Sequence, residues 1–225
     1  ESSKGTYSLD NLEYKFEEFL ALSGKNKIRG SKDFMTEEMD ISKYPIPGLS
    51  QVVLVKKLKE IQVLVGFSRL QPVSVSDMDD PHFVSIKQKE DNWYPGFEVR
   101  GEGIFLQFDL DALNRWAETA FAIKRKENLL DNYEHSTMNG RIHENLDGPF
   151  VLLHTLSHLL IKQLSYECGY NIASLRERIY YMPEKDPETK MAGLLIYTAS
   201  GDSEGTLGGL VRQGREDCFP RIFKE

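Results

Sequence analysis

The feature that most constrains this chain is a long apolar helix in its second half. Residues 150–168 carry leucine, isoleucine, valine and phenylalanine on nearly every face, and Asp147-Gly148-Pro149 precede them as a typical helix start. Gly169 follows as a left-handed stop signal. Because a helix that is apolar nearly all round usually lies in a protein interior, we expect residues 150–168 to form a buried central helix.

The rest of the chain alternates between helical and strand-like patterns. Apolar residues at helical spacing predict helices, and runs rich in valine, isoleucine and leucine predict strands. We expect helices at residues 9–22, at about 110–131 with Asp109 as the cap, and from Thr206 onward. We expect two strands between Val52 and Leu70, and further strands at 103–108 and 192–199. The predicted fold class is α+β, with a short mixed sheet around the central helix; a mixed α/β arrangement is the alternative.

The charge balance limits the kinds of partner. Lys and Arg number 28 and Asp and Glu number 35, which gives a net charge of −7, so any contact with nucleic acid must come from a local patch. No apolar run approaches the roughly 20 residues that span a bilayer, and we expect no membrane segment. Two cysteines cannot build a disulfide framework, so a cytoplasmic location is the expectation.

His154 and His158 lie four residues apart on the predicted central helix, so both imidazoles point the same way. This spacing is half of a helical metal site. The metalloprotease motif needs Glu directly after the first His, and this chain has Thr155 there; no third ligand is indicated by spacing. We interpret the pair as buried, hydrogen-bonded ties to neighbouring loops, with metal binding as the alternative.

A glycine-rich segment follows the last predicted strand. Residues 201–205 match the Gly-x-Ser-x-Gly nucleophile elbow with Ser203 at its centre, but no histidine follows His158 to act as a base. We therefore interpret Ser203 as a turn residue, with a hydrolase as the alternative. The segment could also direct backbone N–H groups at a phosphate or permit close helix–strand packing. The residues concerned are Gly201, Ser203, Gly205, Gly208 and Gly209.

Charged residues concentrate in two further segments. In the first, Glu98, Arg100 and Glu102 alternate with smaller or apolar residues, and Gly101 and Gly103 permit close backbone approach. A solvated face is the usual explanation for such runs. We hypothesise that both segments instead contact DNA or a partner protein. The hypothesis covers Glu98, Arg100, Glu102, Arg176 and Arg178.

Six segments occur in a fixed order that matches a known family. They are residues 64–70, 97–105, 153–160, 167–170, 175–180 and 195–210. Together they resemble the C-terminal half of the DrmB family of DISARM bacteriophage-defence proteins, and that half is similar to the MrfA-type zinc-binding domain found beside superfamily 2 helicases. The resemblance implies an N-terminal helical or linker segment at residues 1–50 and an MrfA-type domain at residues 51–225. We expect this domain to be truncated at its C-terminus.

The resemblance also implies a function. It describes a non-catalytic subunit of an antiviral complex that associates with a DrmA-like helicase and engages phage DNA through that complex. A hydrolase that uses Ser203 or the pair His154 and His158, and a purely structural interaction module, are the alternatives. The family carries a four-cysteine zinc site with one cysteine at the position of Cys168; because Cys218 lies in no Cys-x-x-Cys pair, the ligand set here is incomplete.

Overall fold

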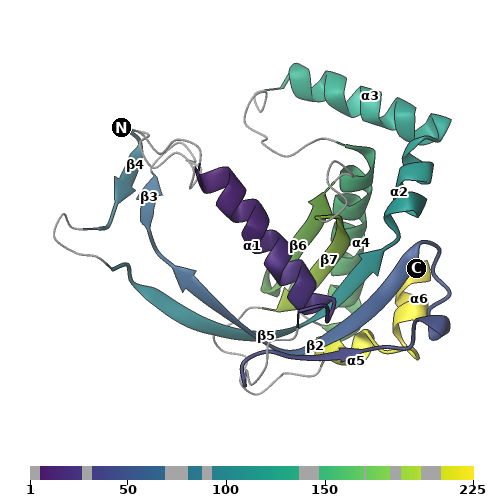
Figure 1. Ribbon diagram of the computed structural model, residues 1–225, viewed down its shortest axis with the longest axis horizontal. Helices are drawn as coiled ribbons and strands as arrows, with labels where there is room; N and C mark the ends of the chain where they lie inside the picture. The colour runs from purple at the N-terminus through teal and green to yellow at the C-terminus, as the bar shows by residue number, and fades with distance from the viewer. Residues whose placement is uncertain are drawn as a thin grey trace.

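An antiparallel five-stranded sheet organises the chain (Figure 1). The computed structural model describes residues 6–26, 32–68, 81–87, 93–136, 147–169, 171–182, 189–198 and 209–225, without the side chains of 6–12. The strand order is β1-β2-β5-β7-β6, and β3 and β4 form a separate pair. The strands are β1 (Met35–Glu38), β2 (Leu49–Val63), β3 (Gly66–Ser68), β4 (Phe83–Ser85), β5 (Gly96–Phe108), β6 (Leu175–Met182) and β7 (Met191–Thr198).

The predicted α+β class is confirmed. The sheet, however, is antiparallel and has long strands, whereas a short mixed sheet was expected. Every strand pair of the described residues is antiparallel, and β2 and β5 are 15 and 13 residues long. The strands predicted in residues 52–70, 103–108 and 192–199 are all present, and β5 begins earlier than expected. Antiparallel pairing needs no helical crossover between neighbouring strands, which leaves the helices to cover the faces of the sheet.

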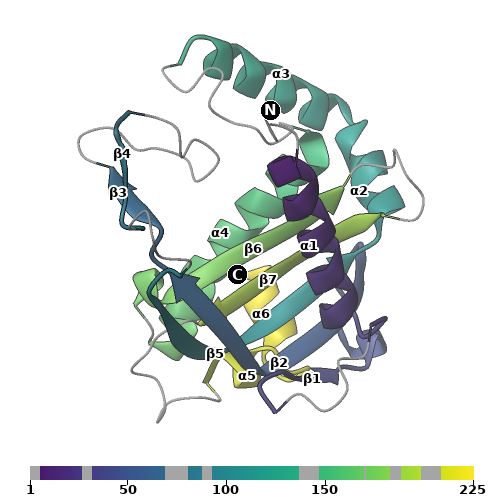
Figure 2. The same ribbon diagram turned by 60° about the vertical axis from the view of Figure 1, so that its left-hand side comes forward.

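Helices cover both faces of the sheet (Figure 2). One face packs against α1 (Thr6–Leu22), which confirms the helix predicted at 9–22. The other packs against α4 (Gly148–Cys168), α5 (Gly209–Gln213) and α6 (Phe219–Lys224). Successive residues of a strand point to opposite faces, and Val52 belongs to the α4 side while Val53 belongs to the α1 side. The sheet is therefore the centre of a three-layer arrangement.

The expectation that residues 150–168 form a buried central helix is wrong in one respect. Leu153, Leu160 and Leu164 are 0–3% exposed against the sheet, but Leu159 is 58% exposed and Tyr166 84% exposed. The sheet holds the central position because its strands are apolar on both faces, so α4 covers it from one side only. The helix does end as predicted, at Gly169 with φ 71°.

The helix predicted at about 110–131 is two helices. Asp109 caps α2 (Leu110–Ala117) as expected, and its carboxylate accepts from two backbone N–H groups. The Thr119 hydroxyl then accepts from the Ala122 N–H and starts α3 (Ala120–Glu134). A threonine in this capping position lets the chain change direction within the predicted span. The helix expected from Thr206 is likewise divided into α5 and α6, with residues 206–208 outside the described part.

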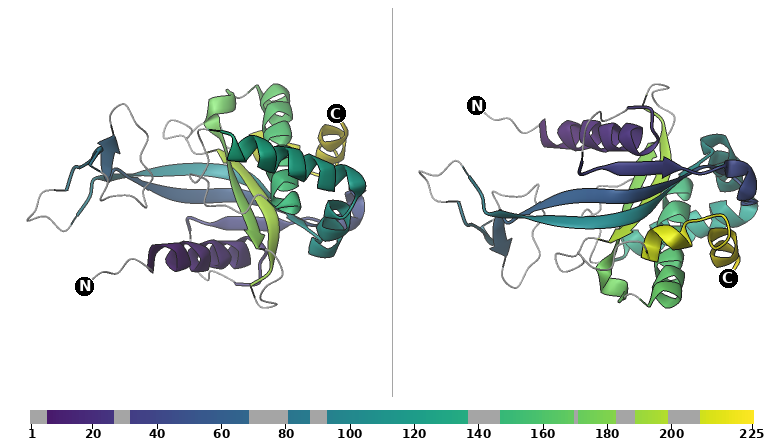
Figure 3. Two further views of the ribbon diagram at one scale, coloured as in Figure 1. Left: turned by 90° about the horizontal axis from the view of Figure 1, so that it is seen from above. Right: turned by 90° about the horizontal axis from the view of Figure 1, so that it is seen from below.

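One end of the sheet continues as a two-stranded arm (Figure 3). The arm consists of residues 58–63 of β2 and 96–101 of β5, and it leads to β3 and β4. A Cβ atom on Gly101 would lie 1.6 Å from the Thr198 carbonyl oxygen at the end of β7. The close approach predicted for this glycine therefore occurs within the chain, where β7 ends and β5 runs on beside β2 alone.

Residues before position 50 pack into the same sheet. Phe19 and Leu22 of α1 are buried, and β1 pairs with β2. The division of the chain at residue 50 stays a prediction. None of the helices in the described ranges is both long enough and apolar enough to cross a bilayer.

Candidate functional site

Three metal-ligating side chains converge between α4 and the edge strand β6. Leu175 and Ile179 of β6 pack on the α4 side of the sheet, so Glu177 between them faces the same way. His154 and His158 are one helical turn apart on α4. Their Nε2 atoms lie 3.0 Å from each other, and each lies 3.2 Å from Glu177 Oε1.

A buried serine, Ser157, contacts Glu177 and fixes its position. The Ser157 hydroxyl lies within hydrogen-bond reach of Glu177 Oε2 and 2.7 Å from the His154 carbonyl oxygen, and its residue is 0% exposed. The Phe150 ring stands beside His154, with ring centroids 5.8 Å apart. Glu177 is therefore fixed by one oxygen while its other oxygen faces the two imidazoles.

The interpretation of His154 and His158 as buried ties to loops is wrong. Their side chains are 48% and 61% exposed, and their described partner is Glu177 of a strand. Helical spacing predicts that the two histidines share a face of α4, but it cannot predict a ligand that comes from β6. A signal was present in the strand period, because alternation puts Glu177 on the opposite face from Arg176 and Arg178.

The cysteine zinc site that the resemblance implies does not fit the described residues. A four-cysteine site needs four thiolates, and this chain has two cysteines, Cys168 and Cys218. The Cys168 thiol lies 3.9 Å from the Gly209 carbonyl oxygen, and burial raises its pKa to about 11 in the metal-free chain. In the described part of the chain, neither cysteine joins a group of three metal-ligating side chains.

The charged run on β5 divides into a buried and an exposed part. Glu102 is 1% exposed, and its Oε1 accepts a hydrogen bond from the Leu210 N–H at 2.8 Å. The hypothesis that Glu102 lies on a partner-facing surface is therefore wrong, because the carboxylate is used inside the chain at the start of α5. Glu98 and Arg100 lie on the arm and are exposed, and Glu98 Oε1 is 3.5 Å from Lys59 Nζ.

Arg176 and Arg178 also pair within the chain. Arg176 Nη1 lies 2.9 Å from Glu60 Oε1, and Arg178 Nε lies 2.5 Å from Glu18 Oε2. Both arginines stand on the α1 side of β6, away from Glu177. Their charges link β6 to β2 and α1. The hypothesis that Glu98, Arg100, Arg176 and Arg178 contact DNA or a partner stays a prediction.

The glycine-rich segment is only partly described. Gly201, Ser203, Gly205 and Gly208 lie outside the described residues, so the phosphate and hydrolase interpretations of this segment stay untested. Gly209 begins α5.

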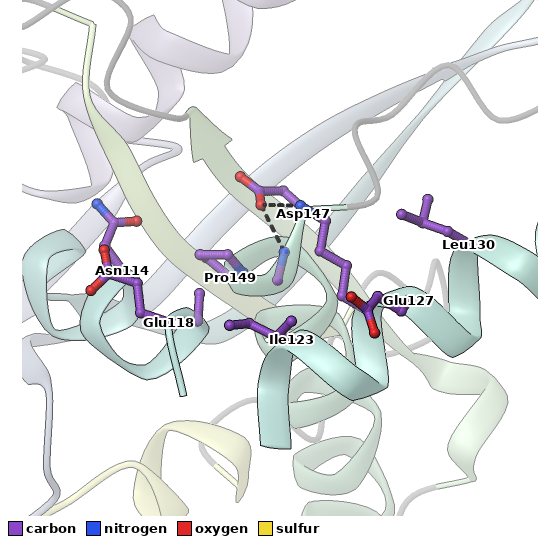
Figure 4. A pocket seen from close by; sticks show the side chains of 10 residues that line it. Asn114, Glu118, Ile123, Glu127, Leu130, Asp147 and Pro149 are labelled. Atoms are coloured by element: carbon purple, nitrogen blue, oxygen red, sulfur yellow. Dashed lines mark hydrogen bonds and ion pairs between the residues drawn. The ribbon is translucent and has the colours of Figure 1, made fainter. Parts of the chain in front are cut away.

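A cleft of about 530 Å³ opens between α2, α3 and the start of α4 (Figure 4). One of its charged lining residues is Asp147, which caps α4 through the Gly148 N–H. The Tyr181 hydroxyl donates to the Asp147 carboxylate at 2.8 Å, and Lys126 Nζ lies 3.5 Å from it. These contacts of Asp147 join the start of α4 to α3 and β6 at the edge of the cleft.

Comparison with known proteins agrees with the motif resemblance. Residues 156–219 match the MrfA Zn-binding domain family, and this range includes His158 and Glu177. The DISARM protein DrmB of Bacillus paralicheniformis is 34% identical over 210 residues, which cover 91% of this chain. The chain spans 36% of the length of that relative. The resemblance read from the six segments is therefore confirmed: the chain is related over nearly its whole length to the DISARM protein DrmB and carries a match to the MrfA Zn-binding domain.

Proposed function

We propose that this chain is a non-catalytic part of a DISARM-type antiviral complex. The observation that carries the proposal is the 34% identity to DrmB across 91% of the chain. A non-catalytic role is supported by the sequence, in which no histidine follows His158 to serve Ser203 as a base. The chain would contribute binding surfaces, while a DrmA-like helicase would provide the helicase activity on DNA.

The arm is the surface proposed for the helicase. Ile61 and Phe97, on opposite faces of the arm, are 61% and 60% exposed. Charged residues border them, among them the Lys59–Glu98 pair and Arg100. Large apolar side chains within a charged rim are typical of protein contact sites. The arm also projects from the rest of the sheet (Figure 3).

Co-purification with a DrmA-type helicase tests this proposal. Arg100→Glu and Phe97→Asp are each expected to weaken helicase capture at least about tenfold, more than an exposed ion pair contributes. Both residues are exposed, so the melting temperature of the isolated chain should stay nearly constant. The matched controls are Arg115→Glu on α2 and Phe121→Asp on α3, which are exposed and lie away from the arm.

The same complexes are then titrated with DNA across a salt series. Because the chain carries a net charge of −7, the isolated chain should bind DNA weakly, and the helicase complex should show the steeper salt dependence that marks phosphate contacts. Equal helicase capture by the arm variants and the controls would contradict the arm as the contact surface. Failure of the wild-type chain to associate with the helicase would contradict the function itself.

A further inference from the structure

The atoms His154 Nε2, His158 Nε2 and Glu177 Oε1 form a nearly equilateral triangle. Its sides are 3.0, 3.2 and 3.2 Å. Ligands of one zinc ion, with bonds of about 2.0–2.1 Å, stand about 2.9–3.4 Å apart in octahedral or tetrahedral geometry. We propose that these three residues form an open binding site for a divalent transition-metal ion. The proposal is independent of the helicase contact, and it uses neither of the two cysteines.

The donor set selects the class of ion. Two imidazole nitrogens and one carboxylate oxygen are a recurrent ligand set for zinc and for neighbouring transition metals. Magnesium and calcium prefer oxygen ligands and would gain little from two imidazoles. The site is therefore expected to take Zn²⁺, Co²⁺ or Ni²⁺ and to ignore Mg²⁺ and Ca²⁺.

The protein holds the ligands in place before an ion arrives. His154 and His158 share one face of a regular helix, which fixes their relative position. Ser157 contacts the oxygen of Glu177 that does not face the imidazoles, an arrangement that orients a metal-binding carboxylate. The backbone of α4 and the pairing of β6 with β7 therefore supply the rigidity that such a site requires.

The site is open on its outer side. The histidine side chains are 48% and 61% exposed, whereas Glu177 is 23% exposed beneath them. Three protein ligands leave at least one coordination position, which water would fill. A bound ion would also link α4 to β6, so it should raise the melting temperature of the chain.

Metal titration of the purified chain, with a tag that contains no histidine, tests the site. The measurements are Zn²⁺ affinity by competition with a chelating dye, and the Co²⁺ absorption spectrum. The background variant carries Cys168→Ser and Cys218→Ser, so that thiolates cannot contribute. We expect this variant to keep Zn²⁺ affinity and to show a Co²⁺ spectrum without thiolate charge-transfer bands.

Single substitutions then assign the ligands. In that background, His158→Ala and Glu177→Gln should each weaken Zn²⁺ binding more than tenfold and abolish the Zn²⁺-dependent rise in melting temperature; Ser157→Ala should weaken binding about 10–100-fold. The control is His135→Ala, because His135 is exposed and lies beside the single carboxylate of Asp131. His158 is largely exposed, so the metal-free variant should melt like its parent. Absence of Zn²⁺ binding in the cysteine-free background, or binding that survives both ligand substitutions, would overturn the proposal.

Discussion

At the scale of single residues, buried polar groups and close contacts fix how the strands and helices meet. Glu102 is buried and accepts the Leu210 N–H, which joins β5 to the start of α5. Gly101, one residue earlier, lets the Thr198 carbonyl oxygen approach to a distance that no Cβ would allow. A run that looks like one charged strand face in the sequence therefore contains both a buried junction and an exposed arm.

The pairing of Glu167 with Arg221 makes stability depend on pH. Arg221 donates two hydrogen bonds to the Glu167 carboxylate at 2.8 and 2.9 Å, which lowers the pKa of that carboxyl below its ordinary value of 4.5. A depressed pKa contributes stability that is complete above the unfolded value and is lost as pH falls through the folded one. Glu167→Gln should therefore reduce stability at pH 7, and its difference from wild type should shrink as pH falls below 4.5 and through the lower folded pKa of Glu167.

Urea unfolding at a series of pH values measures this difference. The control is Glu225→Gln, because Glu225 Oε1 lies 3.6 Å from the same arginine, farther than the two Glu167 oxygens at 2.8 and 2.9 Å. If the difference in stability between Glu167→Gln and wild type does not change with pH, the Glu167–Arg221 pair is not the source of the pH dependence.

At the scale of elements, α4 has one face against the sheet and one face outward. Leu160 is 3% exposed and Leu159 is 58% exposed, although the two are neighbours in sequence. Leu160→Ala should cost about 2–5 kcal/mol of unfolding free energy because it leaves a cavity in the core. Leu159→Ala should change stability by less than about 0.5 kcal/mol. Urea midpoints of the two variants check this, and equal shifts would contradict the orientation of α4.

At the scale of the whole molecule, an aromatic group on the other face joins α1 to the sheet. Phe19 lies 5.8 Å from Phe105 and 6.0 Å from Tyr180, measured between ring centroids. Phe19→Ala should cost about 3–5 kcal/mol and lower the single melting transition of the chain. Phe121→Ala, at a site 73% exposed, is the control. If the variant instead keeps the wild-type transition and loses only helical signal, residues 1–50 would be a separate unit, as the predicted division implies.

Much of the fold could be predicted because its signals are local. Capping residues mark the ends of helices through their own backbone contacts, as Asp109 and Gly169 do. Strands rich in aliphatic residues can be predicted from composition, and β2 and β7 overlap the segments that the sequence predicts. The boundary between α2 and α3 also has a local signal, because Thr119 is a residue type that commonly caps helices.

The candidate site required the tertiary structure. By itself the sequence determined that His154 and His158 share a helical face, since that follows from helix geometry. It also determined that Glu177 and the flanking arginines face opposite ways once residues 175–182 form a strand. Only the packing of α4 beside the edge strand brings Glu177 Oε1 within 3.2 Å of both imidazoles. The physical reason is that helix and strand periods repeat over a few residues. Contact between Glu177 and histidines that lie 19 and 23 residues before it depends instead on how the hydrophobic faces of two elements pack together.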